Sequence, residues 1–337
     1  MKHGAGISIS LLTIWLALLA PVRAETIVLA VPGPGNLAFL PVYLAKAIGA
    51  DTDEGLELKL RHFNSGPLAI RDLMTRNSDF VVIGLPAIAT ARADGIPVYA
   101  IGQLSQSAMF VFMLRADLKH KVRTLAQLSH RRIGTPTGND KQRAMGTMVA
   151  EHLFRKAGLT PNDVQFIPTG LNRQSQRAAL STHLVDALLG DEPFASEMVA
   201  EGLAVVLADM YPPRHSNALL GGNLVRAALA TRENVYAKHP QTVKKVLRML
   251  NRSLQWIAQH TPTECAEILA GQPGFNLEQR QALIAILQRG LGMFPDQVGW
   301  DQHALDATEK FFHNNANNPA EAKLSFADFI RHSPANE

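Results

Sequence analysis

Cysteine is nearly absent from this sequence. Cys265 is the only one among 337 residues, which excludes a disulfide framework and a cluster of thiolate metal ligands. No two of the twelve histidines stand four residues apart, as on a zinc-binding helix, and no G-x-S-x-G stretch marks a nucleophile elbow. Aromatic residues make up only 6% of the chain and the formal net charge is only +4, so a nucleic-acid surface is not indicated. The sequence therefore gives no support for hydrolase catalytic residues, a metal centre or a nucleic-acid partner.

Long hydrophobic runs are also scarce, and the one near the N-terminus is short. Residues 7–20 are mostly apolar, but hydroxyl side chains interrupt them and the run falls short of the ~20 apolar residues of a membrane span. Lys2 precedes this run, and Val22-Arg23-Ala24 follows it as a small-x-small pattern. We therefore expect residues 1–24 to be a secretory signal peptide. Export without disulfides suits a bacterial periplasm, which is the predicted location of the mature chain.

Short β-rich runs alternate with helical segments along most of the chain, which predicts an α/β fold with mostly parallel sheets flanked by helices. The predicted strands are residues 27–31, 56–63, 80–84, 98–102, 109–114, 132–135, 164–168, 187–189, 204–207 and 223–230. The main predicted helices are residues 37–48, 67–76, 86–93, 140–157 and 173–180. Residues 233–331 are almost purely helical and are expected to pack on the first lobe or to brace both. The predicted division is 25–105 for the first part of lobe 1, 106–214 for lobe 2, and 215–337 for the return to lobe 1 with the C-terminal helices.

A glycine-rich turn follows the first predicted strand. Gly33, Gly35 and Ala38 have the G-x-G-x-x-[GA] spacing of a dinucleotide-binding turn. However, the second strand ends in Arg61 and His62 without the acid of that fingerprint, two prolines interrupt the turn, and an exported protein meets little NAD. The glycines are therefore interpreted as turn residues that expose backbone amides, and no cofactor is implied.

Polar turns follow the other strands of the first lobe as well. In open α/β sheets, ligands bind outside the carboxyl ends of the strands, so these turns are expected to meet at one edge of the sheet. Each of them is also an ordinary turn taken alone, because turns favour Gly, Pro, Asn and Ser. The four segments are Gly33-Pro34-Gly35-Asn36, Asn64-Ser65-Gly66-Pro67, Gly84-Leu85-Pro86 and Gln103-Leu104-Ser105-Gln106.

In the second lobe, residues 134–143 lie between a predicted strand and a long helix. Asn139 is a good N-cap residue, and the free amides of the first turn, with Thr137 and Gly138, form a possible site for an oxyanion or a carbonyl. Lys141 and Arg143 would raise the local potential. Asp140 has the opposite effect, because a carboxylate in the first turn already complements the helix dipole. Both interpretations stay open.

Acidic and basic residues near two other second-lobe turns also allow two interpretations. Asp191 or Glu192 could pair with an amine of the ligand, or Asp191 could cap the helix that follows. Arg173 and Arg177 share one helical face, which is either a solvated face or a phosphate clamp.

The order and spacing of these segments resemble one family: the nitrate, sulfonate and taurine group of periplasmic substrate-binding proteins for ABC importers. That group includes binders of the thiamine pyrimidine precursor. The segments that carry the resemblance are the opening strand, G-x-x-N turn and helix, Asn77-Ser78-Asp79-Phe80, Ala91 to Val98, Thr124 to Leu128, Thr135-Pro136-Thr137-Gly138, Val185-Asp186-Ala187 and Glu192-Pro193. The chain departs from the group at Gly190-Asp191, where a Trp is common.

The resemblance implies a two-lobed type II periplasmic binding protein fold that holds its ligand in the cleft between the lobes. The resemblance implies no catalytic residue, metal or cofactor. The partners of such a protein would be a small solute and an inner-membrane ABC permease with its ATPase. A hinged clamp of this kind is expected to be a monomer. Asn36 would hydrogen-bond the solute and Phe39 would form an apolar wall. The implied ligand-binding residues are Gly35, Asn36, Phe39, Ser65, Gly84, Leu85, Pro86, Gln103, Thr137, Gly138, Asn139, Asp191 and Asn223.

The solute is predicted to be small and either polar or anionic, of the sulfonate, nitrate or taurine kind. Three alternatives stay open: a thiamine-pyrimidine-precursor binder, a periplasmic sensor for a membrane kinase, and an enzyme like the yeast thiamine-pyrimidine synthase. The last alternative is opposed by the lone Cys265 and by the export signal, because that chemistry uses a cysteine-rich segment.

Overall fold

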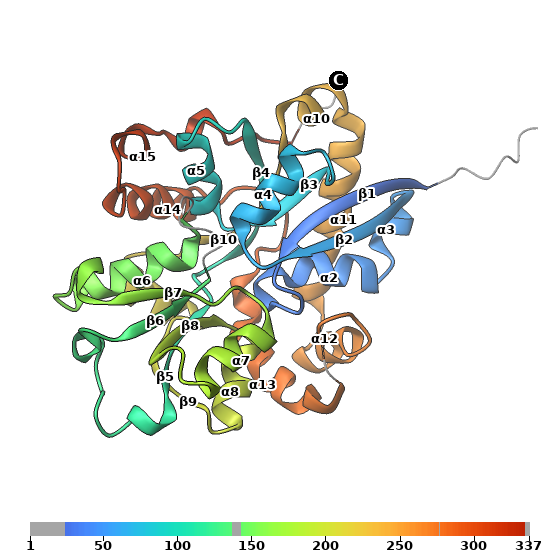
Figure 1. Ribbon diagram of the computed structural model, residues 1–337. Helices are drawn as coiled ribbons and strands as arrows, with labels where there is room; N and C mark the ends of the chain where they lie inside the picture. Colours follow the sequence, from blue (N-terminus) through green and yellow to red (C-terminus); the bar gives the residue numbers. More distant parts are fainter. Residues whose placement is uncertain (1–23, 137–142, 276, 334–337) are drawn as a thin grey trace, which may run out of the picture.

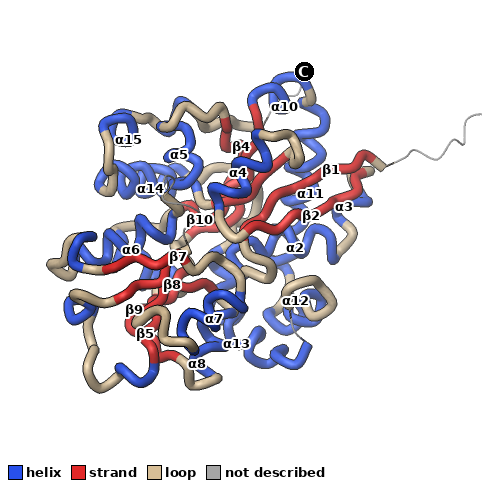
Figure 2. The backbone as a smooth tube through the Cα atoms, viewed as in Figure 1, coloured by secondary structure: helices blue, strands red, loops and turns tan. Residues whose placement is uncertain are grey.

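The computed structural model describes residues 24–136, 143–275 and 277–333. Within these ranges ten strands form two separate five-stranded sheets, and helices pack against both (Figure 1). Figure 2 shows the strands as two groups surrounded by helices. The predicted α/β fold with two sheet-based halves is confirmed.

The first sheet has the strand order β2-β1-β3-β10-β4. β1 pairs in parallel with β2 and β3, whereas β10 runs antiparallel to β3 and β4. Every residue of β3 and β10 is buried, which explains why both read as continuous apolar runs rather than as alternating ones. We call this sheet with the helices packed on it lobe 1. Its strands are β1 (Glu25–Pro32), β2 (Leu56–Phe63), β3 (Phe80–Ile83), β4 (Val98–Gln106) and β10 (Val225–Arg232).

The second sheet repeats this topology with the order β7-β6-β8-β5-β9, and we call its half lobe 2. β6 pairs in parallel with β7 and β8, whereas β5 runs antiparallel to β8 and β9. Four strands of each sheet thus share one direction, as predicted for mixed, mostly parallel sheets. The strands are β5 (Phe110–Arg115), β6 (Arg132–Thr135), β7 (Gln165–Pro168), β8 (Ala187–Asp191) and β9 (Ala204–Asp209).

The two antiparallel strands, β5 and β10, are those by which the chain enters a sheet from the other lobe. Because they run against their neighbours, their first residues lie at the edge where the parallel strands end. Phe110 pairs in register with Asp191, the last residue of β8, and Ala228 pairs with Ile83, the last residue of β3. This topology brings the start of β5 and the start of β10 to the carboxyl ends of the parallel strands, where ligands of α/β proteins bind.

Helices follow the strands of each lobe along the chain (Figure 1). In lobe 1 they are η1 (Leu37–Phe39), α2 (Leu40–Ala47), α3 (Ala50–Asp53), α4 (Gly66–Met74) and α5 (Leu85–Ala93). In lobe 2 they are η2 (Ala116–Leu118), η3 (Leu125–Leu128), α6 (Met145–Lys156), η4 (Pro161–Asp163), α7 (Arg173–Ser181), α8 (Phe194–Ala200) and α9 (Pro213–Leu220).

The C-terminal helices contact both lobes. α11 packs on α2 and α3, α14 and α15 pack on α5, and α13 packs on α8 of lobe 2. Arg248 and Arg252 of α11 both pair with Glu54 after α3, at 2.7 and 2.9 Å. The C-terminal segment thus contacts both lobes, as expected of a brace, and α13 is the helix that reaches lobe 2. The helices are α10 (Glu233–Lys238), α11 (Pro240–Gln259), α12 (Pro262–Leu269), η5 (Leu277–Gln279), α13 (Arg280–Gly290), η6 (Leu291–Met293), α14 (Gln302–Asn314), α15 (Pro319–Lys323) and η7 (Phe326–Asp328).

All ten predicted strands are present within a few residues of their predicted bounds. The predicted start of the long second-lobe helix at residue 140 is wrong, because α6 begins at Met145 with Ala144 as its N-cap residue. The helix expected after Glu192-Pro193 is present as α8, whereas helices α3 and α9 were not predicted from the sequence. No helix within the described residues is long and apolar enough to cross a lipid bilayer. The lobe boundaries proposed from the sequence stay a prediction.

Candidate functional site

A small cavity of about 30 Å³ lies between the two lobes. Apolar side chains dominate its wall, and residues of both sheets contribute to it. A molecule held there contacts both lobes at once. From lobe 1 the lining residues are Pro32, Phe39, Gly66, Ile83, Gly84, Ala87 and Arg226; from lobe 2 they are Phe110, Pro136, Ala144, Met145, Gly146 and Leu171.

Among the described residues that line this cavity, Arg226 is the only charged one. It is the second residue of β10, and its side chain is only 4% exposed. The guanidinium carbon lies 4.5 Å from the ring centroid of Phe110 and 5.3 Å from that of Phe39. Both distances are within the range of cation–π attraction, so one aromatic ring from each lobe holds this cation in place.

The partner of Arg226 is Asp191, the last residue of β8 in lobe 2. Arg226 Nη2 donates to Asp191 Oδ1 at 2.6 Å, and the aspartate side chain is 1% exposed. The ion pair therefore connects the two lobes in a buried site. Asp191 Oδ2 and Arg226 Nε are both buried and have no hydrogen-bond partner among the described residues. An unsatisfied buried polar atom costs free energy, which marks this pair as a candidate polar site. Arg226 lines the cavity, whereas Asp191 is not among its described lining residues.

Asn36 supports the loop that carries Phe39. Its Oδ1 accepts a hydrogen bond from the Ala38 amide at 2.9 Å and so caps η1, while its buried Nδ2 has no acceptor among the described residues. The amide of Leu37, the residue after Asn36, donates to the Glu192 carbonyl oxygen at 3.0 Å. The turn after β1 thus contacts the turn after β8, and the two turns join the lobes beside the Arg226–Asp191 pair.

Glu192 follows Asp191 in this interlobe turn, and its bond to Pro193 is cis. Ser196 donates to the Glu192 carboxylate through its amide at 3.0 Å and through its hydroxyl at 2.8 Å. Burial nevertheless raises the pKa of Glu192 above its ordinary value of 4.5, against the opposing effects of Ser196 and Arg289. The predicted capping of the helix by Asp191 is wrong, since Pro193 is the N-cap residue of α8 and Asp191 pairs with Arg226.

We expect Glu192→Gln to change the pH dependence of stability. A raised carboxyl pKa means that the folded state holds the proton more tightly than the unfolded state, so wild-type stability falls as pH rises from about 4.5 through the folded-state pKa. Glutamine removes this loss, and the Tm of the variant relative to wild type is expected to rise between pH 4 and pH 8. A Tm difference that is equal at both pH values contradicts the effect of burial.

Of the remaining predicted site residues that the structure describes, only Phe39 and Gly84 line the cavity. Ser65 caps α4 by accepting from the Leu68 amide at 3.4 Å. Leu85 and Pro86 form the buried first turn of α5 beside Gly84. Asn223 lies just before β10, and its buried Oδ1 has no hydrogen-bond partner among the described residues.

Gln103 and Gly35 have other neighbours. The Gln103 amide donates to the Gly299 carbonyl at 2.9 Å and its Oε1 accepts from the Asp301 amide at 3.3 Å, so it contacts the C-terminal segment. A Cβ added at Gly35 would lie 2.2 Å from the Gly274 carbonyl oxygen, so this glycine is needed for contact with the C-terminal segment. Neither residue lines the cavity. Thr137, Gly138 and Asn139 lie outside the described residues.

Arg173 and Arg177 each have a carboxylate partner. Arg173 donates to Glu197 at 2.6 and 2.8 Å, and Arg177 donates to Glu201 at 2.6 Å. The phosphate-clamp interpretation has no support from this arrangement, because both guanidinium groups already pair with acids of α8 or its C-cap residue.

The residue that sequence reasoning missed is Arg226. Its signal was present: it is the only charge within the apolar run Leu224 to Ala230, and a charged residue in a fully buried strand requires a partner.

Comparison with known proteins identifies the family. A family model described as NMT1/THI5 like matches residues 36–264, which is more than half of the chain. The chain belongs to the NMT1/THI5-like family. Three solved structures are similar to this NMT1/THI5-like protein over most of its length. A protein from Bordetella bronchiseptica RB50 has a TM-score of 0.82 at 20% identity and covers 92% of this chain and 95% of its own.

The other two structures have names that state a ligand. The alkanesulfonate-binding protein SsuA from Xanthomonas axonopodis pv. citri, bound to MOPS, has a TM-score of 0.68 at 19% identity, with 92% of this chain and 99% of that chain covered. The nitrate-binding protein NrtA from Synechocystis PCC 6803 has a TM-score of 0.68 at 15% identity, with 92% and 86% covered. At these identities the similarity shows the fold alone, which is the type II periplasmic binding protein fold.

Proposed function

We propose that this protein is the solute-binding component of an ABC import system and that it captures a small polar or anionic solute between its two lobes. The observation that carries the proposal is the buried Arg226–Asp191 pair, in which a cation of lobe 1 that lines an otherwise apolar cavity pairs with a carboxylate of lobe 2. The similar structures named as sulfonate- and nitrate-binding proteins support the same assignment. The protein is a binding protein rather than an enzyme.

The mechanism follows from where the contacts lie. A solute in the cavity contacts residues of both lobes, so it binds the closed conformation more tightly than an open one and shifts the population toward closure. An inner-membrane permease with its ATPase then recognises the closed form. The predicted signal peptide at residues 1–24 and the periplasmic location belong to this proposal.

Arg226 is the proposed anchor of an anionic solute group. Its Nε can donate to a sulfonate, nitrate or carboxylate oxygen, and a charge-assisted hydrogen bond of this kind is stronger than a neutral one. Apolar neighbours such as Phe39, Phe110 and Ile83 suit the organic part of the solute. An alkyl sulfonate or a compound of the taurine kind fits this combination.

A second candidate is the thiamine pyrimidine precursor. Asp191 Oδ2 and Arg226 Nε offer one acceptor and one donor close together, and the rings of Phe39 and Phe110 line the cavity beside Arg226. An aminopyrimidine presents the complementary donor and acceptor on a flat ring that can stack.

Two larger hollows on the molecule fit this function less well. One of about 240 Å³ is lined by residues such as Ile101, Leu247 and Trp300, and one of about 330 Å³ by residues such as Ile70 and Ile96. All described lining residues of both hollows come from lobe 1 or from the C-terminal segment on it, so a solute bound there would not draw the lobes together.

A thermal-shift screen of the mature protein tests the proposal. The panel contains alkyl sulfonates, taurine, nitrate, carboxylates and aminopyrimidines. We expect one compound class to stabilise the protein by about 2.7 kcal/mol at a hundredfold excess over its dissociation constant. Turnover of a stabilising compound, or no stabilisation by any member of the panel, contradicts the proposed function.

A further inference from the structure

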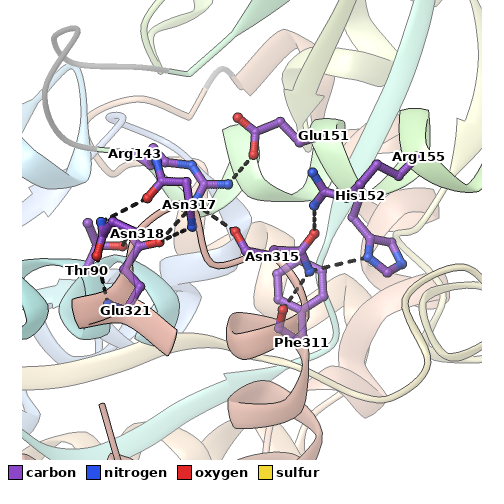
Figure 3. A network of polar contacts seen from close by, with 10 residues as sticks. All are labelled: Thr90, Arg143, Glu151, His152, Arg155, Phe311, Asn315, Asn317, Asn318 and Glu321. Atoms are coloured by element: carbon purple, nitrogen blue, oxygen red, sulfur yellow. Dashed lines mark hydrogen bonds and ion pairs between the residues drawn. The ribbon is translucent and has the colours of Figure 1, made fainter. Parts of the chain in front are cut away.

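A polar network lies at the start of α6 (Figure 3). None of the ten residues drawn there lines the solute cavity. Arg143 is the central residue of the network. The three residues that follow Arg143, namely Ala144, Met145 and Gly146, all line the cavity. Whatever fixes Arg143 therefore also fixes this part of the cavity wall.

Arg143 has three polar partners. Its Nη1 donates to the Asn315 carbonyl oxygen at 2.9 Å and pairs with Glu321 Oε2 at 3.2 Å, and its Nη2 pairs with Glu151. The side chains of Arg143 and Glu321 are 13% and 1% exposed, so this is a largely buried ion pair. The Coulomb attraction of such a pair is weakly screened by salt.

The partners of Arg143 are themselves held in place. Glu321 Oε2 accepts from the Asn317 amide at 2.9 Å, and Glu321 Oε1 accepts from the Thr90 hydroxyl at 3.4 Å. Asn315 donates through Nδ2 to the Phe311 carbonyl at 2.6 Å, and Arg155 of α6 donates to its Oδ1. Two of the acceptors of Arg143, Glu321 and Asn315, are therefore held by further hydrogen bonds.

The network connects the two lobes. Glu151, His152 and Arg155 are residues of α6 in lobe 2, whereas Thr90 belongs to α5 of lobe 1. The segment that carries Asn315 and Glu321 belongs to α14 and α15, which pack on α5. The Arg143–Glu321 pair can therefore form only while α6 lies against lobe 1.

We propose that Arg143 is a positioning residue for solute binding. By pairing with Glu321 and Asn315 it fixes Ala144, Met145 and Gly146 against the cavity and stabilises the closed conformation. This inference rests on the proposed function, in which the closed conformation is the one that holds the solute. Removing the positive charge of Arg143 leaves the buried Glu321 carboxylate without its cation. The closed form then loses more stability than a single hydrogen bond provides.

The test measures the distance between the lobes without any solute. Spin labels are attached at Lys59→Cys in lobe 1 and Lys119→Cys in lobe 2, which are both exposed positions. Cys265 does not compete for the label, since it is buried and burial raises its thiol pKa to about 11. Pulsed electron–electron double resonance then gives the distribution of distances between the two spin labels, and so between the lobes.

In wild type we expect a population at the short distance of this structure, and Arg143→Met and Glu321→Gln are each expected to reduce it about tenfold. The double variant is expected to lose little more than either single one, because both remove the same pair. Arg143→Lys keeps the charge and is expected to restore part of the population.

The control variant is Arg280→Met, which removes an exposed pair with Glu267 within the C-terminal helices and is expected to keep the wild-type distribution. An unchanged distribution in Glu321→Gln and Arg143→Met, or a wild type without the short distance, overturns the inference. Since no solute is added, this result is independent of whether the thermal-shift screen finds a ligand.

Discussion

Arg226→Met is expected to lower solute affinity about a hundredfold or more and to destabilise the fold. Methionine keeps an unbranched apolar side chain at this position, so the variant removes the charge together with the contacts of the guanidinium with Phe39 and Phe110. The loss leaves Asp191 buried without a cation, and breaking a buried pair from one side costs about 3–5 kcal/mol. The same variant removes the donor proposed for an anionic group of the solute.

Asp191→Asn distinguishes the two contributions. It also breaks the ion pair, but it leaves the Arg226 cation in the cavity without a competing carboxylate. For an anionic solute, affinity is therefore expected to stay the same or to rise, although the variant unfolds at a lower denaturant concentration than wild type. For an aminopyrimidine, affinity is expected to fall, because the carboxylate acceptor is lost.

Urea unfolding and titration with the strongest compound of the thermal-shift screen give both quantities. Arg280→Met is the matched control, since its pair with Glu267 is exposed on both sides, neither residue lines the cavity, and exposed pairs contribute little. Wild-type affinity in Arg226→Met would remove Arg226 from the binding site.

Gly35→Ala is the second variant with a large expected effect. Gly35 has a φ of +75°, in the left-handed region, and a Cβ there would lie 2.2 Å from the Gly274 carbonyl oxygen. A left-handed conformation costs a non-glycine residue about 1–2 kcal/mol, and an overpacked contact costs about 1–3 kcal/mol more. We expect the free energy of unfolding to fall by about 2–5 kcal/mol, because backbone atoms cannot move aside as a flexible side chain does.

Gly55→Ala isolates the effect of the contact. Gly55 has a similar φ of +67°, but a Cβ there would have no atom within 4 Å. Its alanine variant is expected to lose only the backbone contribution of about 1–2 kcal/mol. Equal losses of unfolding free energy in the two variants, measured with urea, would show that the contact with Gly274 contributes nothing.

The strands could be predicted because burial imposes a simple pattern on them. β3 and β10 are buried along their whole length, so an uninterrupted apolar run marks each of them. The start of α6 could not be predicted in the same way. Asn139 and Asp140 fit the residue preferences of a helix N-terminus, but α6 begins at Met145 after Ala144, which makes no side-chain capping bond.

One rule predicted the turn residues that line the cavity, but the same rule did not predict Arg226. Phe39 and Gly84 line the cavity because they follow parallel strands, at whose carboxyl ends ligands bind. Arg226 reaches the same edge from the amino end of β10, because that strand runs antiparallel to its neighbours. The direction of a strand depends on long-range pairing, and a local sequence pattern carries no information about it.

The role of the glycines in the first turn was also beyond local patterns. A Cβ at Gly33 would lie 2.6 Å from the Leu171 carbonyl oxygen of lobe 2, as one at Gly35 would meet Gly274. Both partners are more than 130 residues away along the chain, so the sequence indicates that a turn needs glycine there but not what approaches it.

A crystal structure with the compound that gives the largest thermal shift tests the central claim most directly. The account predicts electron density for that compound between the two sheets, within hydrogen-bonding distance of Arg226 and in contact with Phe39 and Phe110. Density for the compound in the hollow beside Ile101 and Trp300 instead, with the space around Arg226 unchanged, would contradict it.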